Sequence, residues 1–368
     1  MSDAAIRLDR VNKTYAPGAP PAVGALSLQI ERGEVVVLVG PSGCGKTTTL
    51  KMINRIIEPT SGRIEVNGRE IHEMEPHQLR QGIGYVIQQV GLFPHRTVFD
   101  NIATVPRLLR WDRARINDRV AELIDLVGLD PGLLARYPAE LSGGQQQRAG
   151  VARALAADPP VLLMDEPFGA VDPILRTRLQ DELRLLQERL QKTIVLVTHD
   201  IDEAIKLGDR IAIMNIGGVL EQYAPPAEIL REPANAFVES FLGAERGLKR
   251  LSLVHVRDVP LETGPVVGPD ARPAEAIEVM ARERVDWVAV VNDGRVPGWI
   301  SADELRSANK AGELPAHPFS VRVDRDNTLR EALDAIVTSR TQVAIVCDGD
   351  HYLGMLTVGS IVGELERE

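Results

Sequence analysis

The chain has 368 residues, 44% of them hydrophobic, which is enough for two packed globular domains. Its net charge of −10 argues against a nucleic-acid partner bound through a broad basic face, and its two cysteines exclude a disulfide framework and suit a reducing compartment. Residues 1–5 carry no sign of a secretory signal, and no apolar run approaches the roughly 18 residues of a membrane span, so we expect another chain to supply any span.

The first elements predict strands that lead to a loop. Alternation over residues 6–14 predicts a half-buried strand, and residues 26–30 and 35–39 predict two more. Tyr15 precedes a turn-rich loop at 16–21. An aromatic side chain there can stack on a nucleobase, although a lone tyrosine is more often a core or surface residue.

A glycine-rich loop follows the third strand with the pattern G-x-x-x-x-G-K-T, and residues 48–53 continue as a helix. Glycines let successive backbone N–H groups approach a polyphosphate, and the helix start adds a partial positive charge. Lys46 is placed to reach the β- and γ-phosphates, and the Thr47 hydroxyl is placed to bind Mg²⁺. The strand-loop-helix context makes a chance match negligible.

Residues 58–128 predict a helix stop at 58–62 and a strand at 63–68 that ends in an Asn-Gly turn. A further strand at 83–89 ends on Gln88 and Gln89. A capped helix start follows at 97–102, and helical spacing of apolar residues continues over 113–128.

Two further segments predict phosphate chemistry. Residues 141–148 read Leu-Ser-Gly-Gly-Gln-Gln-Gln-Arg, whose serine and glycines at a helix start can form a second phosphate cradle. Residues 161–165 predict a buried parallel strand whose end carries Asp165 and Glu166. Asp165 can hold Mg²⁺, and Glu166 can polarise the water that attacks the γ-phosphate.

The rest of this region predicts a turn at 169–173, a long helix at 174–190 and a buried strand at 193–198. His199 follows that strand; such a histidine is usually structural, but at the same sheet edge as Glu166 it is placed to contact a γ-phosphate. Residues 211–220 predict a closing hairpin, and short helices follow at 228–233 and 237–242.

Residues 250–368 contain an internal repeat. Residues 273–280 align with 329–336, residues 288–291 with 343–346, and residues 298–301 with 354–357. Each copy predicts a helix, a buried strand, a turn, a second strand and a helix.

Residues 40–47, 141–145, 161–166 and His199, in this order and spacing, resemble the nucleotide-binding subunit of ATP-binding-cassette (ABC) transporters over residues 4–243. The resemblance implies an α/β P-loop NTPase cassette with a RecA-like core, an antiparallel β subdomain and a helical subdomain. Residues 51–55 and 84–95 look more narrowly like the ATPase of quaternary-amine importers, which take up glycine betaine, carnitine or choline. That substrate rests on resemblance only.

By position in the matching motifs, the resemblance implies that Lys46, Glu166 and His199 are catalytic. Glu166 would be the base and His199 the switch histidine. It assigns Mg²⁺ to Thr47, Gln88 and Asp165. Gln88 is preferred to Gln89 because it ends the predicted strand. Val171 stands where leucine is usual, which removes no chemical group. The implied ATP contacts are Tyr15, Gly40, Pro41, Ser42, Gly43, Cys44, Gly45, Lys46, Thr47, Thr48, Gln88, Ser142, Gly143, Gly144, Gln145 and Asp172.

The resemblance also implies a mechanism and partners. One P-loop and one LSGGQ in a chain cannot face each other across one ATP, whereas two copies placed head to tail make two composite sites. We therefore expect a homodimer, two integral-membrane permease subunits docking near residues 89–140, and an extracytoplasmic substrate-binding protein. The protein would lie peripherally at the cytoplasmic face of the inner membrane.

The repeat resembles a tandem pair of CBS (cystathionine-β-synthase-type) modules, an α+β unit, at 250–308 and 315–368. Such pairs often bind adenine nucleotides, and an acidic residue three positions after Ser or Thr can hold a ribose. The first copy offers Glu304 after Ser301, whereas the second has Ser360 after Thr357. A regulatory nucleotide site and a purely structural or dimerising pair both remain open.

Three alternative functions were weighed. A soluble ABC ATPase of DNA repair or the ribosome would carry coiled-coil or zinc insertions or two cassettes, and its charge would differ. A regulatory module with a vestigial ATPase conflicts with the presence of Lys46, Glu166 and His199. An importer ATPase for another small solute stays open.

Overall fold

The computed structural model describes residues 4–87, 91–169 and 171–367. The chain divides into two compact units, Met1–Gly243 and Ala244–Glu368, called here the first and second units. Among the described residues, no helix is both long and apolar enough to cross a bilayer.

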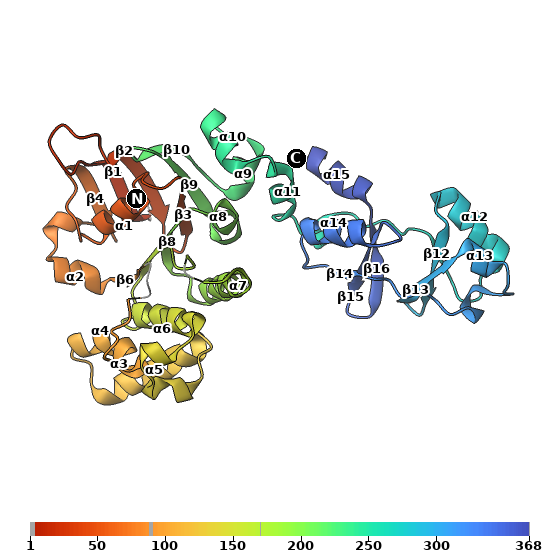
Figure 1. Cartoon of the computed structure of the whole chain (residues 1–368), viewed down its shortest axis with the longest axis horizontal. Helices are drawn as coiled ribbons and strands as arrows, with labels where there is room; N and C mark the ends of the chain where they lie inside the picture. The colour runs from red at the N-terminus through yellow and green to blue at the C-terminus, as the bar shows by residue number, and fades with distance from the viewer. Residues whose placement is uncertain (1–3, 88–90, 170, 368) are drawn as a thin grey trace. The chain divides into compact units, whose positions relative to one another are not determined.

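A mixed sheet forms the centre of the first unit (Figure 1). Its order is β10-β9-β3-β8-β7-β6, and in the described chain all neighbours are parallel except the β9–β10 hairpin. Strands β3, β7 and β8 are buried along their whole length, as expected of parallel strands covered on both faces. The strands are β3 (Val35–Val39), β6 (Ile83–Val86), β7 (Val161–Asp165), β8 (Thr193–Thr198), β9 (Arg210–Asn215) and β10 (Val219–Ala224).

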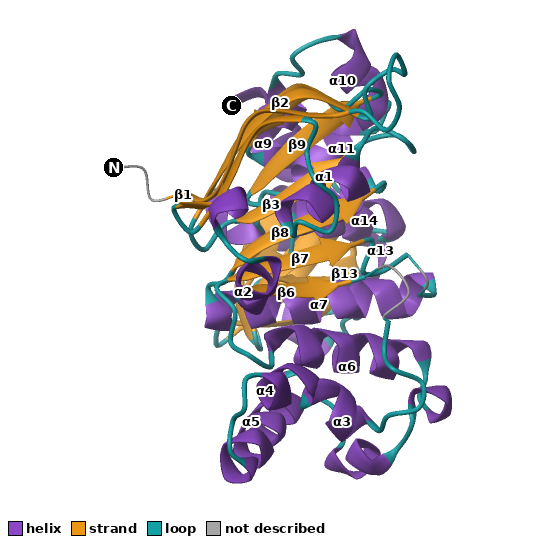
Figure 2. Ribbon diagram, turned by 90° about the vertical axis from the view of Figure 1, so that its left-hand side faces the viewer, coloured by secondary structure: helices purple, strands orange, loops and turns teal. Residues whose placement is uncertain are grey.

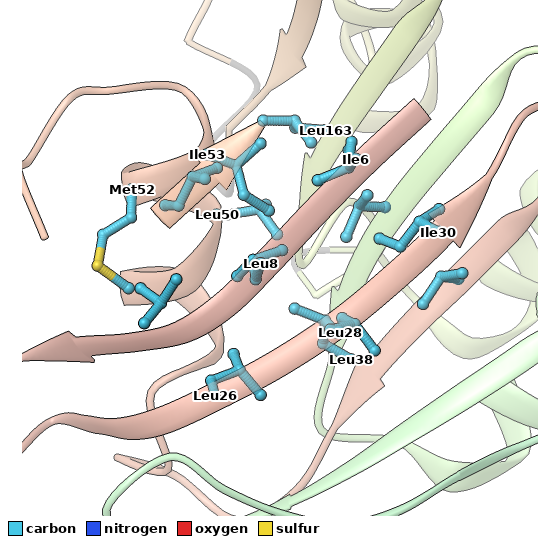
Figure 3. Close-up of a cluster of buried hydrophobic side chains, with 14 of the residues drawn as sticks. Ile6, Leu8, Leu26, Leu28, Ile30, Leu38, Leu50, Met52, Ile53 and Leu163 are labelled. Carbon is cyan, nitrogen blue, oxygen red and sulfur yellow. The ribbon is translucent and has the colours of Figure 1, made fainter. Parts of the chain in front are cut away.

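An antiparallel sheet of order β2-β1-β4-β5 packs near it and shares its core. Figure 3 shows apolar side chains of β1 and β2 together with Leu38 of β3, Leu163 of β7 and residues of the first helix. The sheet's strands are β1 (Ala4–Lys13), β2 (Val23–Glu31), β4 (Ser61–Val66) and β5 (Arg69–Glu70).

Helices α3 to α6 gather below the mixed sheet in Figure 2 and form the predicted helical subdomain. The α-helices of the first unit are α1 (Lys46–Ile53), α2 (Pro76–Gln81), α3 (Val98–Ile102), α4 (Thr104–Leu108), α5 (Arg113–Leu126), α6 (Gly143–Leu155), α7 (Pro173–Leu190), α8 (Ile201–Leu207), α9 (Pro226–Arg231) and α10 (Ala236–Leu242). Short 3₁₀ turns occupy η1 (Ile71–Glu73), η2 (Pro131–Ala135) and η3 (Pro138–Glu140). The predicted ABC cassette architecture is confirmed.

The second unit contains the predicted repeat. Each copy has a sheet, β11-β12-β13 or β14-β15-β16, in which the first pair is parallel and the second antiparallel. Its elements are α11 (Arg246–Leu251), η4 (Val256–Asp258), β11 (Val266–Val267), α12 (Pro273–Glu283), β12 (Trp287–Asn292), β13 (Arg295–Ser301), α13 (Ala302–Leu305), η5 (Ala311–Glu313), β14 (Arg322–Asp324), α14 (Leu329–Thr338), β15 (Ala344–Asp348), β16 (His351–Leu356) and α15 (Val358–Arg367).

The predicted strand at 83–89 is shorter in the structure, where β6 ends at Val86. Val86 pairs with Met164, and the next residue of β7, Asp165, pairs only with Val197 of β8 in the described chain, so β6 stops one pair early. The assignments to Gln88 and Gln89 fall outside the described residues.

Candidate nucleotide site

The carboxyl ends of three adjacent strands, β3, β8 and β7, form the candidate site. They carry the glycine loop, His199, and the pair Asp165 and Glu166, respectively. Because the strands are parallel neighbours, these groups reach the same sheet edge, where α/β proteins bind ligands.

The loop backbone requires glycine at two positions. Gly40 has φ 155°, and a Cβ there would lie 2.1 Å from the Met214 carbonyl oxygen. Gly45 has φ 98°, and its Cβ would lie 2.4 Å from the Ala22 carbonyl oxygen. A side chain is therefore excluded on steric grounds at both positions, and only glycine lets the loop pack against these carbonyl groups.

Lys46 begins α1 and folds back into the loop. Its ammonium donates to the carbonyl oxygens of Gly40 at 2.7 Å and Pro41 at 3.0 Å, and the side chain is buried. Gly45 supplies no side-chain cap, so the first turn of α1 keeps backbone N–H groups for an anion. Pro41, Ser42, Gly43 and Cys44 lie in this loop between the two constrained glycines.

Thr47 and Asp165 meet above the sheet. The Thr47 hydroxyl donates to Asp165 Oδ1 at 2.8 Å. Burial raises the pKa of the Asp165 carboxyl; the Thr47 hydrogen bond opposes that shift, the charge of Glu166 adds to it, and Lys51 and Lys46 oppose it. Asp165 is only 5% exposed, so the two side chains form a largely buried pair of oxygen donors.

Glu166 and His199 face each other across the same edge, with His199 Nδ1 3.5 Å from Glu166 Oε1. Glu166 has φ 44°, an uncommon conformation for a residue with a side chain, and its N–H donates to the Val197 carbonyl at 2.9 Å. The His199 side chain is 60% exposed and the Glu166 side chain 21%. The exposed histidine therefore remains reachable by a ligand above the sheet.

Tyr15 lies beside the start of α1. Its hydroxyl is 3.4 Å from the Thr48 hydroxyl, and the Lys13 ammonium lies 5.3 Å from its ring centroid. The ring is 65% exposed, so one face is free to stack on a base.

Ser142, Gly143, Gly144 and Gln145 lie at the start of α6, apart from α1 in both views (Figures 1 and 2). The Ser142 hydroxyl accepts from the Gln145 N–H at 3.3 Å, and the Gln145 side chain accepts from the Ser142 N–H at 2.9 Å. Among the described residues, no hydrogen bond joins this segment to the glycine loop. A single chain thus leaves the two predicted phosphate cradles separate.

Asp172 caps α7 by accepting from the Leu175 N–H at 3.0 Å. A Cβ on Gly144 would lie 2.9 Å from a methyl group of Leu175. The start of α7 and the start of α6 are therefore in contact.

Three residues near the site were missed from sequence: Arg176, Asp200 and Glu203. Asp200 follows His199 and caps α8 by accepting from the Asp202 and Glu203 N–H groups at 2.9 and 3.3 Å. The spacing of Asp200 and Glu203 matches a capping box, the one available signal, and would have placed Glu203 at the surface. The structure instead buries Glu203 against α7.

In the second unit, two hydroxyls each meet a carboxylate. Ser301 donates to Glu304, whose other oxygen lies 2.7 Å from His317 Nε2; the Ser301 hydrogen bonds and His317 lower the pKa of Glu304 to about 2. Thr357 donates to Glu262 Oε1 at 2.9 Å. Glu262 precedes the first aligned segment of the repeat, residues 273–280, so the comparison of the two copies does not predict it.

Comparisons with known proteins agree with this geometry. Residues 23–169 match the family model described as ABC transporter, and residues 256–310 and 311–367 match CBS domain. The chain is 34% identical to the dimeric structure of MJ0796, a bacterial ABC transporter cassette, covering 60% of this chain and 98% of that one with a TM-score of 0.54. It is 28% identical to cbiO1 of Clostridium perfringens, part of the ABC transporter complex cbiONQ, covering 69% and 100% with a TM-score of 0.59. The fold and site define an ATP-hydrolysing ABC transporter subunit.

Full-length relatives narrow the class. The chain is 46% identical to the glycine betaine/carnitine/choline transport ATP-binding protein OpuCA of Bacillus subtilis, over 97% of this chain and 95% of the relative. It is 48% identical to the osmoprotectant import ATP-binding protein OsmV of Salmonella typhimurium, over 94% and 92%. The protein belongs to the family of osmoprotectant-import ABC ATP-binding proteins with tandem CBS domains.

Proposed function

We propose that this chain hydrolyses ATP to drive import of a quaternary amine of the glycine betaine, carnitine or choline class through separate permease subunits. The observation that carries the ATPase part is the convergence of Lys46, Thr47, Asp165, Glu166 and His199 at one sheet edge. The names of the relatives support the substrate class. Two permease subunits, a substrate-binding protein and a peripheral position on the cytoplasmic face of the membrane complete the proposal.

The donor set fits Mg²⁺. Thr47 Oγ1 and Asp165 Oδ1 are 2.8 Å apart, and both are the oxygen ligands that this ion prefers. The buried carboxylate of Asp165 has the negative charge of Glu166 beside it, which a divalent ion would offset. When bound, Mg²⁺ supplies positive charge that offsets the charge of the β- and γ-phosphates.

The chain's own residues then have separate tasks. The loop N–H groups and Lys46 hold the phosphates; Lys46 must exchange its two carbonyl contacts for phosphate oxygens. Glu166 would accept the proton of the attacking water, and His199, 3.5 Å from that carboxylate, would contact the γ-phosphate. Tyr15 stacks on the base.

Ser142 to Gln145 complete the site of a second copy. In one chain this segment is separate from the glycine loop, while Gly143 has open space around it. Two copies placed head to tail bring each segment to the partner's ATP, so ATP joins the copies and hydrolysis lets them part.

The second unit is proposed as the regulatory part, with the cassette at 4–243 and CBS modules at 250–308 and 315–368. Ser301–Glu304 and Thr357–Glu262 are two hydroxyl–carboxylate pairs of the kind that hold a ribose. An adenine nucleotide is therefore the ligand class to test there, and a purely structural pair is the alternative.

Uptake of labelled glycine betaine, choline and carnitine by a deletion strain at high salt tests the function. Complementation with the wild-type gene should restore uptake of at least one of them, and Lys46→Ala should not, because the lysine is the cation of the phosphate loop. Restored uptake of another solute alone would favour an importer ATPase of different specificity. Stimulation of the purified ATPase by DNA or ribosomes alone would contradict the transport role.

A further inference from the structure

A partly buried polar cluster lies between α7 and α8, beside the turn that carries His199. Arg176, Gln180, Asp200 and Glu203 line an open cavity of about 290 Å³ there. Glu203 is only 5% exposed. Gln180 Nε2 donates to Glu203 Oε2 at 3.3 Å, whereas Glu203 Oε1 is buried without a partner among the described residues. The hydrolysis mechanism proposed above gives Glu203 no role.

Arg176 is the cation of this cluster. Its Nη1 lies 4.0 Å from Asp200 Oδ2, and its Nη2 donates to the Val171 carbonyl at 3.3 Å. Its Nε is buried and, within the described chain, has no partner. Arg176 therefore connects the turn before Asp172 to the turn after His199, with one donor left over.

Asp200 fixes the backbone on both sides of His199. Its carboxylate accepts from the Asp202 and Glu203 N–H groups, and its own N–H donates to the Thr198 hydroxyl at 3.1 Å. A change in the contacts of Asp200 is thus transmitted to the residue between Thr198 and Asp200, which is His199.

Glu203 Oε1 and Arg176 Nε are an unpaired acceptor and an unpaired donor in the same cluster. In the structure Arg176 faces Asp200, the arrangement expected when Glu203 is neutral. With an ionised Glu203, a second negative charge competes for the same guanidinium, because a buried carboxylate requires a partner. Ionisation of Glu203 would therefore favour a second arrangement, in which Arg176 turns from Asp200 to Glu203.

Burial and the neighbouring charges determine the pH at which Glu203 loses its proton. Burial raises the pKa of Glu203 to about 7 and the charge of Asp200 adds to the shift, while hydrogen bonds from Thr198 and Gln180 and the charge of Arg176 oppose it. On α7, Asp181 pairs with Lys206 of α8 at 2.7 Å. Asp202 is exposed, and β3, which packs against α8, consists of apolar residues.

We propose that Glu203 is a positioning residue for His199, and that loss of its proton draws Arg176 from Asp200 and resets the turn that holds His199. This inference rests on the role proposed for His199 in hydrolysis. It adds a pH-dependent control of the nucleotide site that acts through α7 and α8.

The test measures the steady-state ATPase rates of full-length wild type and Glu203→Gln from about pH 6 to about pH 8.5. Dividing the variant rate by the wild-type rate at each pH cancels the titration of groups that the two proteins share. Glutamine keeps the shape of the neutral acid and cannot ionise. The ratio of the two rates should be near one below pH 7 and should depart from one by about threefold or more above it. Asp202→Asn, which removes a neighbouring exposed charge of α8, is the matched control and should give a constant ratio.

Each outcome decides a different point. A ratio for Glu203→Gln that is constant with pH, whether one or below one, overturns the inference, since a merely structural role lowers the rate equally at every pH. Arg176→Met removes the guanidinium that links Glu203 to Asp200, so in that background Glu203→Gln should no longer give a rate ratio that changes with pH. Wild-type turnover in His199→Ala would instead contradict the role of His199 itself.

Discussion

At the scale of residues, the geometry separates nucleotide binding from hydrolysis. Lys46 and Thr47 belong to the loop and to α1, whereas Glu166 stands on a strained backbone position at the end of β7, 3.5 Å from His199. A residue held at φ 44° by an N–H bond to Val197 has its carboxylate aimed by the main chain. Changing that carboxylate should therefore leave the loop intact.

Glu166→Gln is expected to keep ATP binding and to lower turnover by about a hundredfold or more, because the amide cannot accept the proton of water. The ATP-bound pair of chains should then accumulate. Phosphate release gives the rate, and light scattering with Mg²⁺ and ATP gives the mass. Lys46→Ala serves as the comparison, since it should remain a single chain with ATP. Turnover of Glu166→Gln equal to wild type would contradict the role of Glu166 as base.

Residues of the site differ in how far sequence predicts them. Lys46, Thr47, Asp165 and Glu166 follow from local pattern, because a strand end and a glycine loop fix their placement whatever the rest of the chain does. Glu262, Arg176 and Glu203 do not, because each acquires its role from a contact with a distant segment. The capping-box spacing of Glu203 even predicts the wrong environment, since packing against α7 overrides the local pattern.

At the scale of elements, the first turn of α6 has no reason within one chain to contain glycine at position 143. Gly143 has no heavy atom within 4 Å of an added Cβ, and Ser142 with Gln145 already caps the helix. An alanine there would fit the single chain and would favour the helix. The glycine is explained if another surface approaches it, which the head-to-tail pair supplies.

Gly143→Ala should therefore leave the thermal midpoint of the ATP-free protein unchanged or slightly raised, and should lower ATP turnover about tenfold by keeping the partner's triphosphate away. Gly144→Ala is the matched variant: its methyl would press on Leu175 of α7 within the same chain, so it should lower the midpoint. Calorimetry and phosphate release measure the two effects. Full turnover by Gly143→Ala would show that nothing approaches α6 closely.

The elements themselves were largely predictable because their patterns are local. The apolar runs of β3 and β7 and the helical spacing of α5 predicted the right type of element at the right place. The predicted end of β6 was wrong because strand length is set by pairing in the sheet: β7 continues to Asp165, but β6 stops pairing with it after Val86. Whether Gln88 reaches the site stays a prediction.

At the scale of the whole molecule, the two copies in the second unit share their hydrophobic cores. Leu251, Val256 and Val259 precede the first aligned segment of the repeat, at 273–280. They pack in the core of the second copy with Val323, Leu329 and Ile336. A second cluster mixes Trp287 and Val296 of the first copy with Ile345 and Met355 of the second. Comparing the sequence with itself finds the two copies. It does not show that residues 251–259 pack in the core of the second copy, because these residues lie outside the aligned segments.

Removing residues 311–368 should consequently unfold what remains of the second unit. The truncated chain would expose the apolar faces of 251–259 and of β12 and β13, at about 1.5–3 kcal/mol for each large side chain returned to water. Limited proteolysis should degrade residues 244–310 rapidly while residues 1–243 resist, and a hydrophobic dye should bind. Removing 244–368 altogether is the control, since it leaves the core of the first unit complete and should keep ATP hydrolysis. Protease resistance of 244–310 in the shorter truncation would mean that the first copy folds without the second, and the shared core would then be an incidental contact.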